Sequence, residues 1–221
     1  MCRILKGYIL TPFLLLVLGS FQLFAESDEK TYSKIIERKD FIQSASEKFD
    51  INPVYLSAII YTERTKNYDW TDEAFDEVIA RVGQNSSLGF SQVKIKTAYF
   101  IEKQLNDTTS RFYCGKKYAH ILPLSKSPFL LIEKLKNDSL NILYPAAYLR
   151  IIQSFWSKAG YSINNKPEII GSLYQLGLFY PTGEAREPHF FPKANDFGKR
   201  VMESANLFNI FSKEDFKSFI R

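Results

Sequence analysis

The sequence predicts a mainly α domain with a small turn or β segment near residues 84–94. Apolar residues recur at helical spacing along most of the chain, and Gly and Pro fall between these runs, where helices end or begin. The run 83–94 is instead rich in turn-forming residues. Once the first 25 residues are set aside, 196 remain, which suits one domain with its own core. We therefore expect a single domain over residues 26–221.

The first 25 residues have the features of a secretory signal. Arg3 and Lys6 are the only charged residues before Glu26, and the apolar stretch from Tyr8 to Ala25 ends at a small residue that suits cleavage. An uncleaved membrane anchor is the alternative, because these 18 residues approach the length that spans a bilayer. Polar residues within the stretch favour cleavage, so we expect an exported mature chain.

The charge and cysteine content of the mature chain argue against several classes of function. Removing Arg3 and Lys6 lowers the net charge from +5 to +3, which is too mild to indicate a nucleic-acid partner. Cys114 is the only cysteine left, so an intrachain disulfide is not expected. His120 and His189 show no ligand spacing with it. We expect no metal and no cofactor, and membrane contact only through an uncleaved signal. The sequence does not indicate an oligomeric state.

Helices in the first half are expected at 32–49, 52–65, 72–82 and 96–105. Asn52 is the expected N-cap of the second helix, and Pro53 lies in its first turn, where the missing N–H costs nothing. Gly83 is expected to end the third. The segment 106–126, which contains Cys114, lacks clear periodicity and is predicted to be a long loop.

Helices in the second half are expected at 127–135, 139–158, 167–177, 196–207 and 212–220. Ser127 is the expected cap of the first of these. Pro145 falls inside the second, which predicts either a kink or a later start of that helix. The segment 178–195, rich in Pro, Gly and aromatic residues, is predicted to be a loop.

Glu63 is the leading candidate for a chemical role. It shares one face of its helix with Leu56, Ile59 and Ile60, and this apolar face is expected to point inward. Burial against apolar groups raises the pKa of a carboxyl, so that it keeps a proton near neutral pH and can act as a general acid. The alternatives are a solvated surface residue, or a partner for the adjacent Arg64.

A family resemblance begins downstream of Glu63. In the run 85–98, Gly89, Gln92, Thr97 and Ala98 occur in an order that resembles the segment following the catalytic glutamate of lysozyme-like lytic transglycosylases of glycoside hydrolase family 23. That family carries a Gly-Leu-Met-Gln core before a helix that begins near Thr-Ala. Here Phe90 and Ser91 replace the Leu and Met.

Two later segments are similar to the same family. The run 141–149 resembles its helix of Asn-Ile, small residues and Tyr-Leu, and the run 174–177 stands where the family has Tyr-Asn-Ala-Gly. The resemblance covers residues 49–177, and 192–198 is similar to the family's closing stretch. Departures are Arg64 where the family commonly has Ser, Gln175 in place of Asn, and the insertion around Cys114.

The resemblance implies an enzyme that cleaves the β-1,4 bond between MurNAc and GlcNAc in peptidoglycan glycan strands. Glu63 would act first as acid and then as base, and the products would carry 1,6-anhydro-MurNAc ends. Gln92 would hydrogen-bond the sugar, and Tyr174 would orient Glu63 or contact the substrate. Further substrate-binding candidates are Gly89, Phe90, Ser91 and Gln175. The implied location is periplasmic or secreted, in a bacterial cell envelope.

Three other readings of the sequence stay open, and one is an unrelated exported helical bundle, in which Glu63 and Gln92 would lie far apart. A hydrolytic lysozyme, or a chitinase-like relative, would use a second acid from among Asp69, Asp72, Glu73 and Asp76. An inactive glycan-binding envelope protein would result if a buried Arg64 kept Glu63 ionised. The aromatic residues that are candidates for lining a cleft are Tyr99, Phe100, Tyr148, Phe179 and Tyr180.

Overall fold

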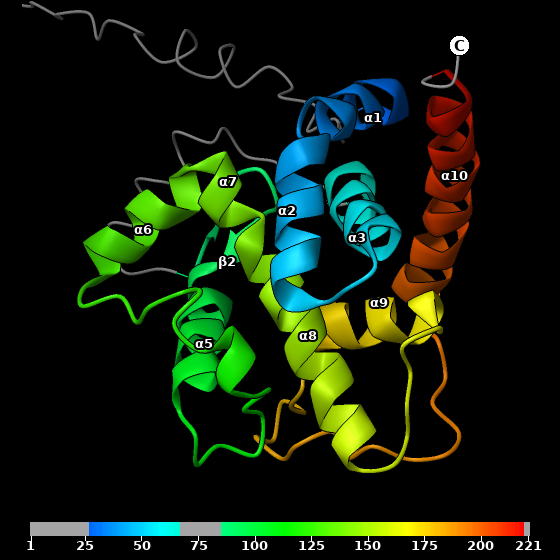
Figure 1. Cartoon of the computed structure of the whole chain (residues 1–221). Helices are drawn as coiled ribbons and strands as arrows, with labels where there is room; N and C mark the ends of the chain where they lie inside the picture. The colour runs from blue at the N-terminus through cyan, green and yellow to red at the C-terminus, as the bar shows by residue number, and fades with distance from the viewer. Residues whose placement is uncertain (1–26, 67–84, 219–221) are drawn as a thin grey trace, which may run out of the picture.

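The computed structural model describes residues 27–66 and 85–218, and it confirms the mainly α prediction (Figure 1). The expected signal at 1–25, and the expected helix at 72–82, lie outside these residues. Within them, no helix combines the length and the apolar character needed to cross a bilayer.

The first predicted helix is two helices in the structure. α1 (Asp28–Glu37) and α2 (Lys39–Phe49) are separated at Arg38, so the prediction of one helix over 32–49 was wrong. No Gly or Pro marks this break. The Arg38 side chain instead bonds Asp138 at 2.7 Å and lies 4.4 Å from the centre of the Phe90 ring. These contacts with distant residues accompany a break that local sequence does not encode.

α3 (Pro53–Lys66) begins as expected, because the Val54 N–H donates to the Asn52 side-chain oxygen at 2.9 Å. β1 (Ser87–Leu88) and β2 (Val93–Lys94) then form an antiparallel pair. This pair confirms the small β segment predicted near residues 84–94. α5 (Ile95–Asn106) follows β2 directly.

The segment after α5 contains the short 3₁₀ helix η1 (Lys116–Tyr118) within a longer irregular stretch. α6 (Pro128–Lys136) has the expected Ser127 cap, and α7 (Asp138–Asn141) precedes α8 (Leu143–Lys158). The predicted helix over 139–158 is therefore divided. Pro145 lies in the first turn of α8, which confirms the later start.

α9 (Pro167–Leu176) is found where the sequence predicts it. α10 (Asp196–Ser218) runs unbroken through the two helices expected at 196–207 and 212–220, so the predicted division was wrong. No Gly or Pro separates the two expected helices, and a helix tolerates the intervening residues at small cost. Gly198 allows α10 to pack tightly on α9, because a Cβ there would lie 2.0 Å from the Glu168 carbonyl oxygen.

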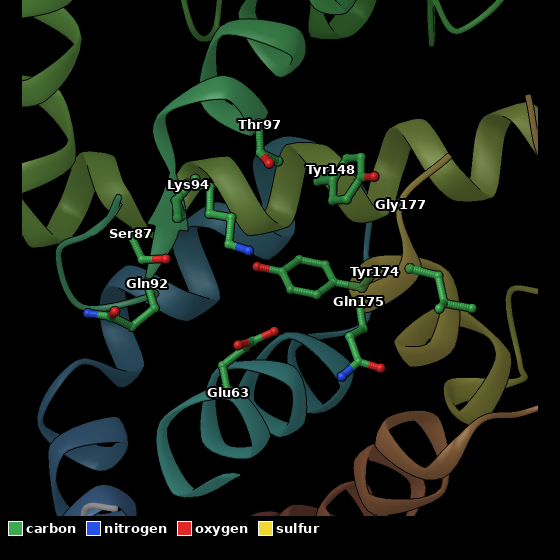
Figure 2. A pocket seen from close by; sticks show the side chains of 11 residues that line it. Glu63, Ser87, Gln92, Lys94, Thr97, Tyr148, Tyr174, Gln175 and Gly177 are labelled. Atoms are coloured by element: carbon green, nitrogen blue, oxygen red, sulfur yellow. The ribbon is translucent and has the colours of Figure 1, made fainter. Parts of the chain in front are cut away.

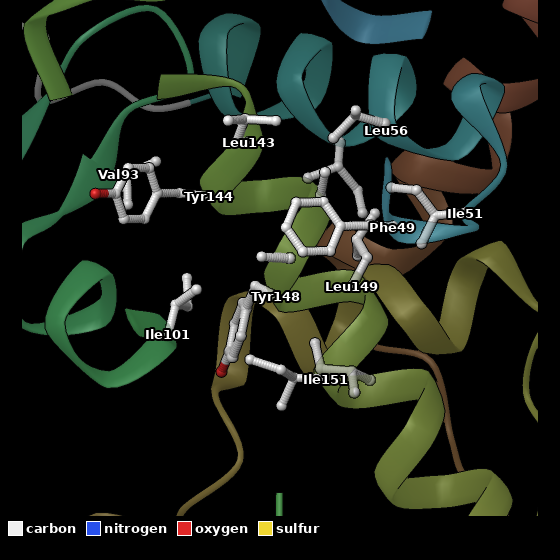
Figure 3. Packing of buried hydrophobic residues seen from close by; sticks show 14 of the residues in the cluster. Phe49, Ile51, Leu56, Val93, Ile101, Leu143, Tyr144, Tyr148, Leu149 and Ile151 are labelled. Carbon is white, nitrogen blue, oxygen red and sulfur yellow. The ribbon is translucent and has the colours of Figure 1, made fainter. Parts of the chain in front are cut away.

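The core is arranged around α8, which runs through the middle of the fold in Figure 1. Figure 3 shows Leu149 of α8 grouped with Phe49 and Leu56, while Tyr144 and Tyr148 lie on the side of the helix nearer to Ile101 of α5. All six side chains are buried. The side chains of α8 thus join α2 and α3 to α5 in one hydrophobic core.

A buried carboxylate, Glu102 of α5, fixes the polar part of this core. Its side chain is fully buried and accepts hydrogen bonds from the Ser125 N–H at 2.6 Å, the Ser125 hydroxyl at 2.9 Å and the Tyr144 hydroxyl at 2.7 Å. The Lys134 ammonium forms an ion pair with it at 2.8 Å. One carboxylate therefore links α5, α6, α8 and the loop before α6.

Replacing Glu102 with Ala is expected to lower the free energy of unfolding by about 3 kcal/mol, because several buried donors and one cation would lose their acceptor. Urea denaturation of the mature chain measures this change. The matched control is Glu133→Ala on exposed α6 surface, expected to change stability by less than about 0.5 kcal/mol. Equal effects of the two changes would contradict a special role for Glu102.

Candidate active site

A cavity of about 280 Å³ lies between α3, the β1–β2 pair and the start of α5 on one side, and α8 and α9 on the other (Figure 2). Its size is near the lower end of ligand-binding pockets. It brings together three of the predicted site residues, Glu63, Gln92 and Tyr174, from segments far apart in the sequence, and Gln175 joins them at its edge. The other residues that line it are Ser87, Val93, Lys94, Thr97, Tyr148, Leu176 and Gly177.

Glu63 reaches this cavity from the apolar face of α3, as the sequence predicts. Leu56, Ile59 and Ile60 on the same face are almost completely buried, whereas Glu63 itself is partly buried. Burial raises the pKa of the Glu63 carboxyl from its ordinary 4.5 to about 7, and the nearby Lys94 ammonium opposes this rise. A substantial fraction of Glu63 therefore carries a proton at neutral pH.

Arg64, the neighbour that could have held Glu63 ionised, contacts Phe90. It is buried, its guanidinium donates to the Phe90 carbonyl oxygen at 2.7 Å, and it lies 4.6 Å from the centre of the Phe90 ring. Among the described residues, the charged group that acts on the Glu63 pKa is Lys94. This geometry favours the protonated acid over an Arg64–Glu63 pair.

Two tyrosines form the opposite wall of the cavity. Figure 2 shows the Tyr174 ring between α9 and Lys94, with its hydroxyl turned into the same space as the Glu63 carboxylate. Burial, and then the proximity of Glu63 and Tyr148, holds the pKa of Tyr174 well above its usual range. The Tyr148 ring lies 5.6 Å from it, centre to centre. Tyr174 therefore stays protonated and can donate a hydrogen bond.

The turn between the two strands has a backbone conformation that its residues and packing specify. Gly89 has φ +70°, and a Cβ there would lie 2.0 Å from the Leu135 carbonyl oxygen, so no larger residue fits. Gln92 also has positive φ, at 52°. Its backbone N–H and its side-chain amide both donate to the Gly89 carbonyl oxygen at 3.0 Å. These bonds hold Gln92 at the edge of the cavity.

Asn141, at the end of α7, anchors this turn from behind. Its amide group donates to the Leu88 carbonyl at 2.9 Å and to the Leu135 carbonyl at 2.8 Å, and its oxygen accepts from the Ser91 N–H at 2.6 Å. The side chain is completely buried. The resemblance matched Asn141 to the family helix. In the structure, the hydrogen bonds of its side chain position the turn.

Phe90 and Ser91 do not line the cavity, although the sequence suggested them as substrate contacts. Both are buried, and the Phe90 ring packs between the guanidinium groups of Arg38 and Arg64. Gly89, likewise, is not in the wall and acts through the shape of the turn. Gly89 has a left-handed conformation, and the two residues that follow it in the turn, Phe90 and Ser91, point into the core. The order of residues in the sequence does not show this direction.

Gln175 is exposed at the edge of the cavity and is held there by the start of α10. Its side-chain oxygen accepts from the Asn195 amide at 2.8 Å, while the Asn195 oxygen accepts from the Gly198 N–H at 2.8 Å and so caps α10. Here Gln stands where the resembling family has Asn. The residue still reaches the cavity in this chain.

Sequence reasoning did not propose Ser87 and Lys94 as site residues. They are paired with each other across the two strands and line the cavity, while the neighbouring pair, Leu88 and Val93, is buried. Strict alternation of polar and apolar residues across this short hairpin was the available signal. Among the aromatic candidates, Tyr148 lines the cavity, whereas Phe100 and Phe179 pack against each other at 5.9 Å.

Comparison with protein-family models and with curated proteins finds no match to this chain. Within residues 27–66 and 85–218, no group of three or more His, Cys, Asp and Glu side chains is placed to hold a metal ion. Burial raises the pKa of the Cys114 thiol to about 11, so it is not activated as a nucleophile.

Replacing Asn141 with Ala is expected to lower the free energy of unfolding by about 3 kcal/mol and to loosen the turn that holds Gln92. The change leaves two carbonyls and one N–H without their buried partner. Urea denaturation checks the stability, and amide hydrogen exchange at Ser91 and Gln92 checks the turn. The exposed Asn165→Ala is the control, and unchanged exchange in Asn141→Ala would contradict the anchoring role.

The Glu63 pKa predicts a definite effect of pH on stability. Between pH 4.5 and about 7 the unfolded chain has released the Glu63 proton while the folded chain keeps it, so the free energy of unfolding falls as pH rises. Glu63→Gln removes this loss and should be more stable than wild type by about 3 kcal/mol above pH 7, with little difference below pH 4.5. Denaturation at pH 4 and pH 8 measures it. A constant difference at both pH values would contradict the raised pKa.

Proposed function

We propose that this protein is a peptidoglycan lytic transglycosylase, exported to the bacterial envelope, in which Glu63 is the catalytic acid and base. The observation that carries the proposal is a carboxyl of pKa about 7, held by burial at the wall of a cavity. A general acid works best when its pKa lies near the working pH. The ordered family resemblance from residue 49 to 177 supplies the substrate, a MurNAc–GlcNAc glycan strand.

The proposed reaction begins with protonated Glu63. It donates its proton to the glycosidic oxygen as the bond from that oxygen to C1 of MurNAc breaks. The C6 hydroxyl of the same MurNAc then attacks C1, and its proton passes to the Glu63 carboxylate. The product is a 1,6-anhydro sugar, and the acid is regenerated without a water molecule. One carboxyl group performs both steps.

Three neighbouring side chains have roles in this scheme. The Tyr174 hydroxyl, which stays protonated, is suited to donate to the Glu63 carboxylate after the first step. The Lys94 ammonium lowers the Glu63 pKa and so stabilises the same charged state. The Gln92 side chain, at the edge of the cavity, is suited to bond an acetamido or hydroxyl group of the sugar.

Hydrolysis by a lysozyme-like mechanism is the second candidate. Glycosidases that add water generally use two carboxyl groups, and Glu63 is the one carboxylate among the described residues that line the cavity. The acids that sequence analysis named as possible partners, Asp69, Asp72, Glu73 and Asp76, lie outside the described residues.

The mature protein is expected to release muropeptides with 1,6-anhydro ends from purified sacculi, detected by mass spectrometry. Glu63→Gln should reduce the release rate by at least about 10²-fold, because the amide cannot donate the proton. The rate for wild type should fall as pH rises above about 7, where Glu63 loses its proton.

Glu133→Gln, an exposed change far from the cavity in sequence, is the matched control and should keep full activity. Reducing ends in place of anhydro ends would assign the hydrolase. Equal release by wild type and Glu63→Gln, or none from either, would remove the enzymatic proposal and leave a glycan-binding protein.

A further inference from the structure

Lys94 presents its ammonium to the cavity that contains Glu63. It is the last residue of β2, and its side chain lines the cavity. Figure 2 shows the ammonium turned into the same space as the Glu63 carboxyl and the Tyr174 hydroxyl. Its charge also acts on the Glu63 carboxyl. A cation therefore lies beside the proposed proton donor, where the reacting sugar ring would bind.

The backbone on either side of Lys94 is held by the strand pair and the start of α5. The N–H of Ile95, the next residue, donates to the Ser86 carbonyl oxygen at 3.2 Å. Lys94 is paired with Ser87 across the two strands, and both side chains line the cavity. Residues directly opposite each other in an antiparallel pair are neighbours on one face. The hairpin thus offers an ammonium and a hydroxyl side by side to a bound ligand.

The chemical complement of this pair is a carboxylate. At neutral pH a substantial fraction of Glu63 keeps its proton, and in this form, which starts the proposed reaction, it does not neutralise Lys94. An ammonium has three donors and no acceptor, and the Ser87 hydroxyl can also donate. A carboxylate has two acceptor oxygens and the opposite charge, so its hydrogen bonds to such donors are charge-assisted.

The proposed substrate carries a carboxylate on the ring that reacts. MurNAc bears a lactyl ether on C3, two carbons from the C1 at which the bond breaks, whereas GlcNAc has a hydroxyl there. When no peptide is attached, the lactyl group ends in a carboxylate. When a peptide is attached, the same position is an uncharged amide. A cation next to Glu63 can therefore distinguish the two forms of the strand.

We propose that Lys94, together with Ser87, binds the free lactyl carboxylate of the MurNAc ring that Glu63 acts on, and so gives the protein a preference for strands without peptides. This inference rests on the proposed function for the sugar in the cavity. It also gives the site a place in a reaction sequence. Hydrolysis of the amide bond between the lactyl group and the peptide is the class of reaction that supplies such strands.

The test measures binding to Glu63→Gln, which leaves the sugar uncut. The two probes are the tetrasaccharide of alternating GlcNAc and MurNAc as the free acid, and the same molecule with its lactyl carboxylates converted to methylamides. Because Lys94 is exposed, its ion pair is worth less than a buried one, and calorimetry should find the free acid bound about fivefold more tightly at low salt. Salt at about 1 M should shrink this difference. Equal affinity for the two probes at low salt would overturn the inference.

Variants of Lys94 in the same Glu63→Gln background test the assignment. Lys94→Gln should abolish the difference between the probes, whereas Lys94→Arg, which keeps the charge, should retain most of it. Lys96→Gln is the matched control, because Lys96 is exposed on the same segment but outside the cavity wall, and it should leave the difference unchanged. A difference that persists in Lys94→Gln would contradict the role of Lys94.

Cleavage by the wild type separates this inference from the proposed function. Wild type should cut the free acid about fivefold faster than the methylamide at low substrate concentration. Binding that depends on Lys94, without cleavage of either probe, would retain the lactyl site and remove the enzyme. Cleavage of both probes at equal rates, with equal affinities, would overturn the inference alone.

Discussion

Incomplete hydration of the Glu63 carboxyl is the constraint on which the candidate site depends. The apolar face of α3 is buried against the core, and this burial brings Glu63 to the cavity wall with a pKa near 7. The same burial lowers the free energy of unfolding when Glu63 ionises, so contacts elsewhere in the fold must offset that loss. Polar anchors elsewhere, at Glu102 and Asn141, are the contacts that hold the neighbouring elements in place.

The two walls of the cavity are built from very different parts of the chain. One wall is a two-residue hairpin, whose position is set by packing behind it and by a glycine that nothing larger can replace. The other is the end of α9, fixed by the cap of α10 through Asn195. The hairpin has no stable conformation by itself, because a hairpin this short needs support from the rest of the fold. Site geometry is thus a property of the tertiary structure.

This origin explains what the sequence could and could not predict. Helices with strong caps, such as those starting after Asn52 and Ser127, were predicted because their signals are local. The division at Arg38 was missed, since the contacts made there involve distant residues. Glu63 followed from helical periodicity, whereas the inward direction of Phe90 depends on a turn conformation and on Arg38 and Arg64.

Asn141 has a consequence for how the two walls of the cavity differ. Its amide bonds the hairpin turn and the end of α6 while it terminates α7, so buried hydrogen bonds tie these three segments together. The opposite wall, at the end of α9 and the 178–195 loop, is more exposed to solvent. One buried side chain thus sets the position of a hairpin that is too short to hold its own shape, and the form of the cavity on that side depends on it.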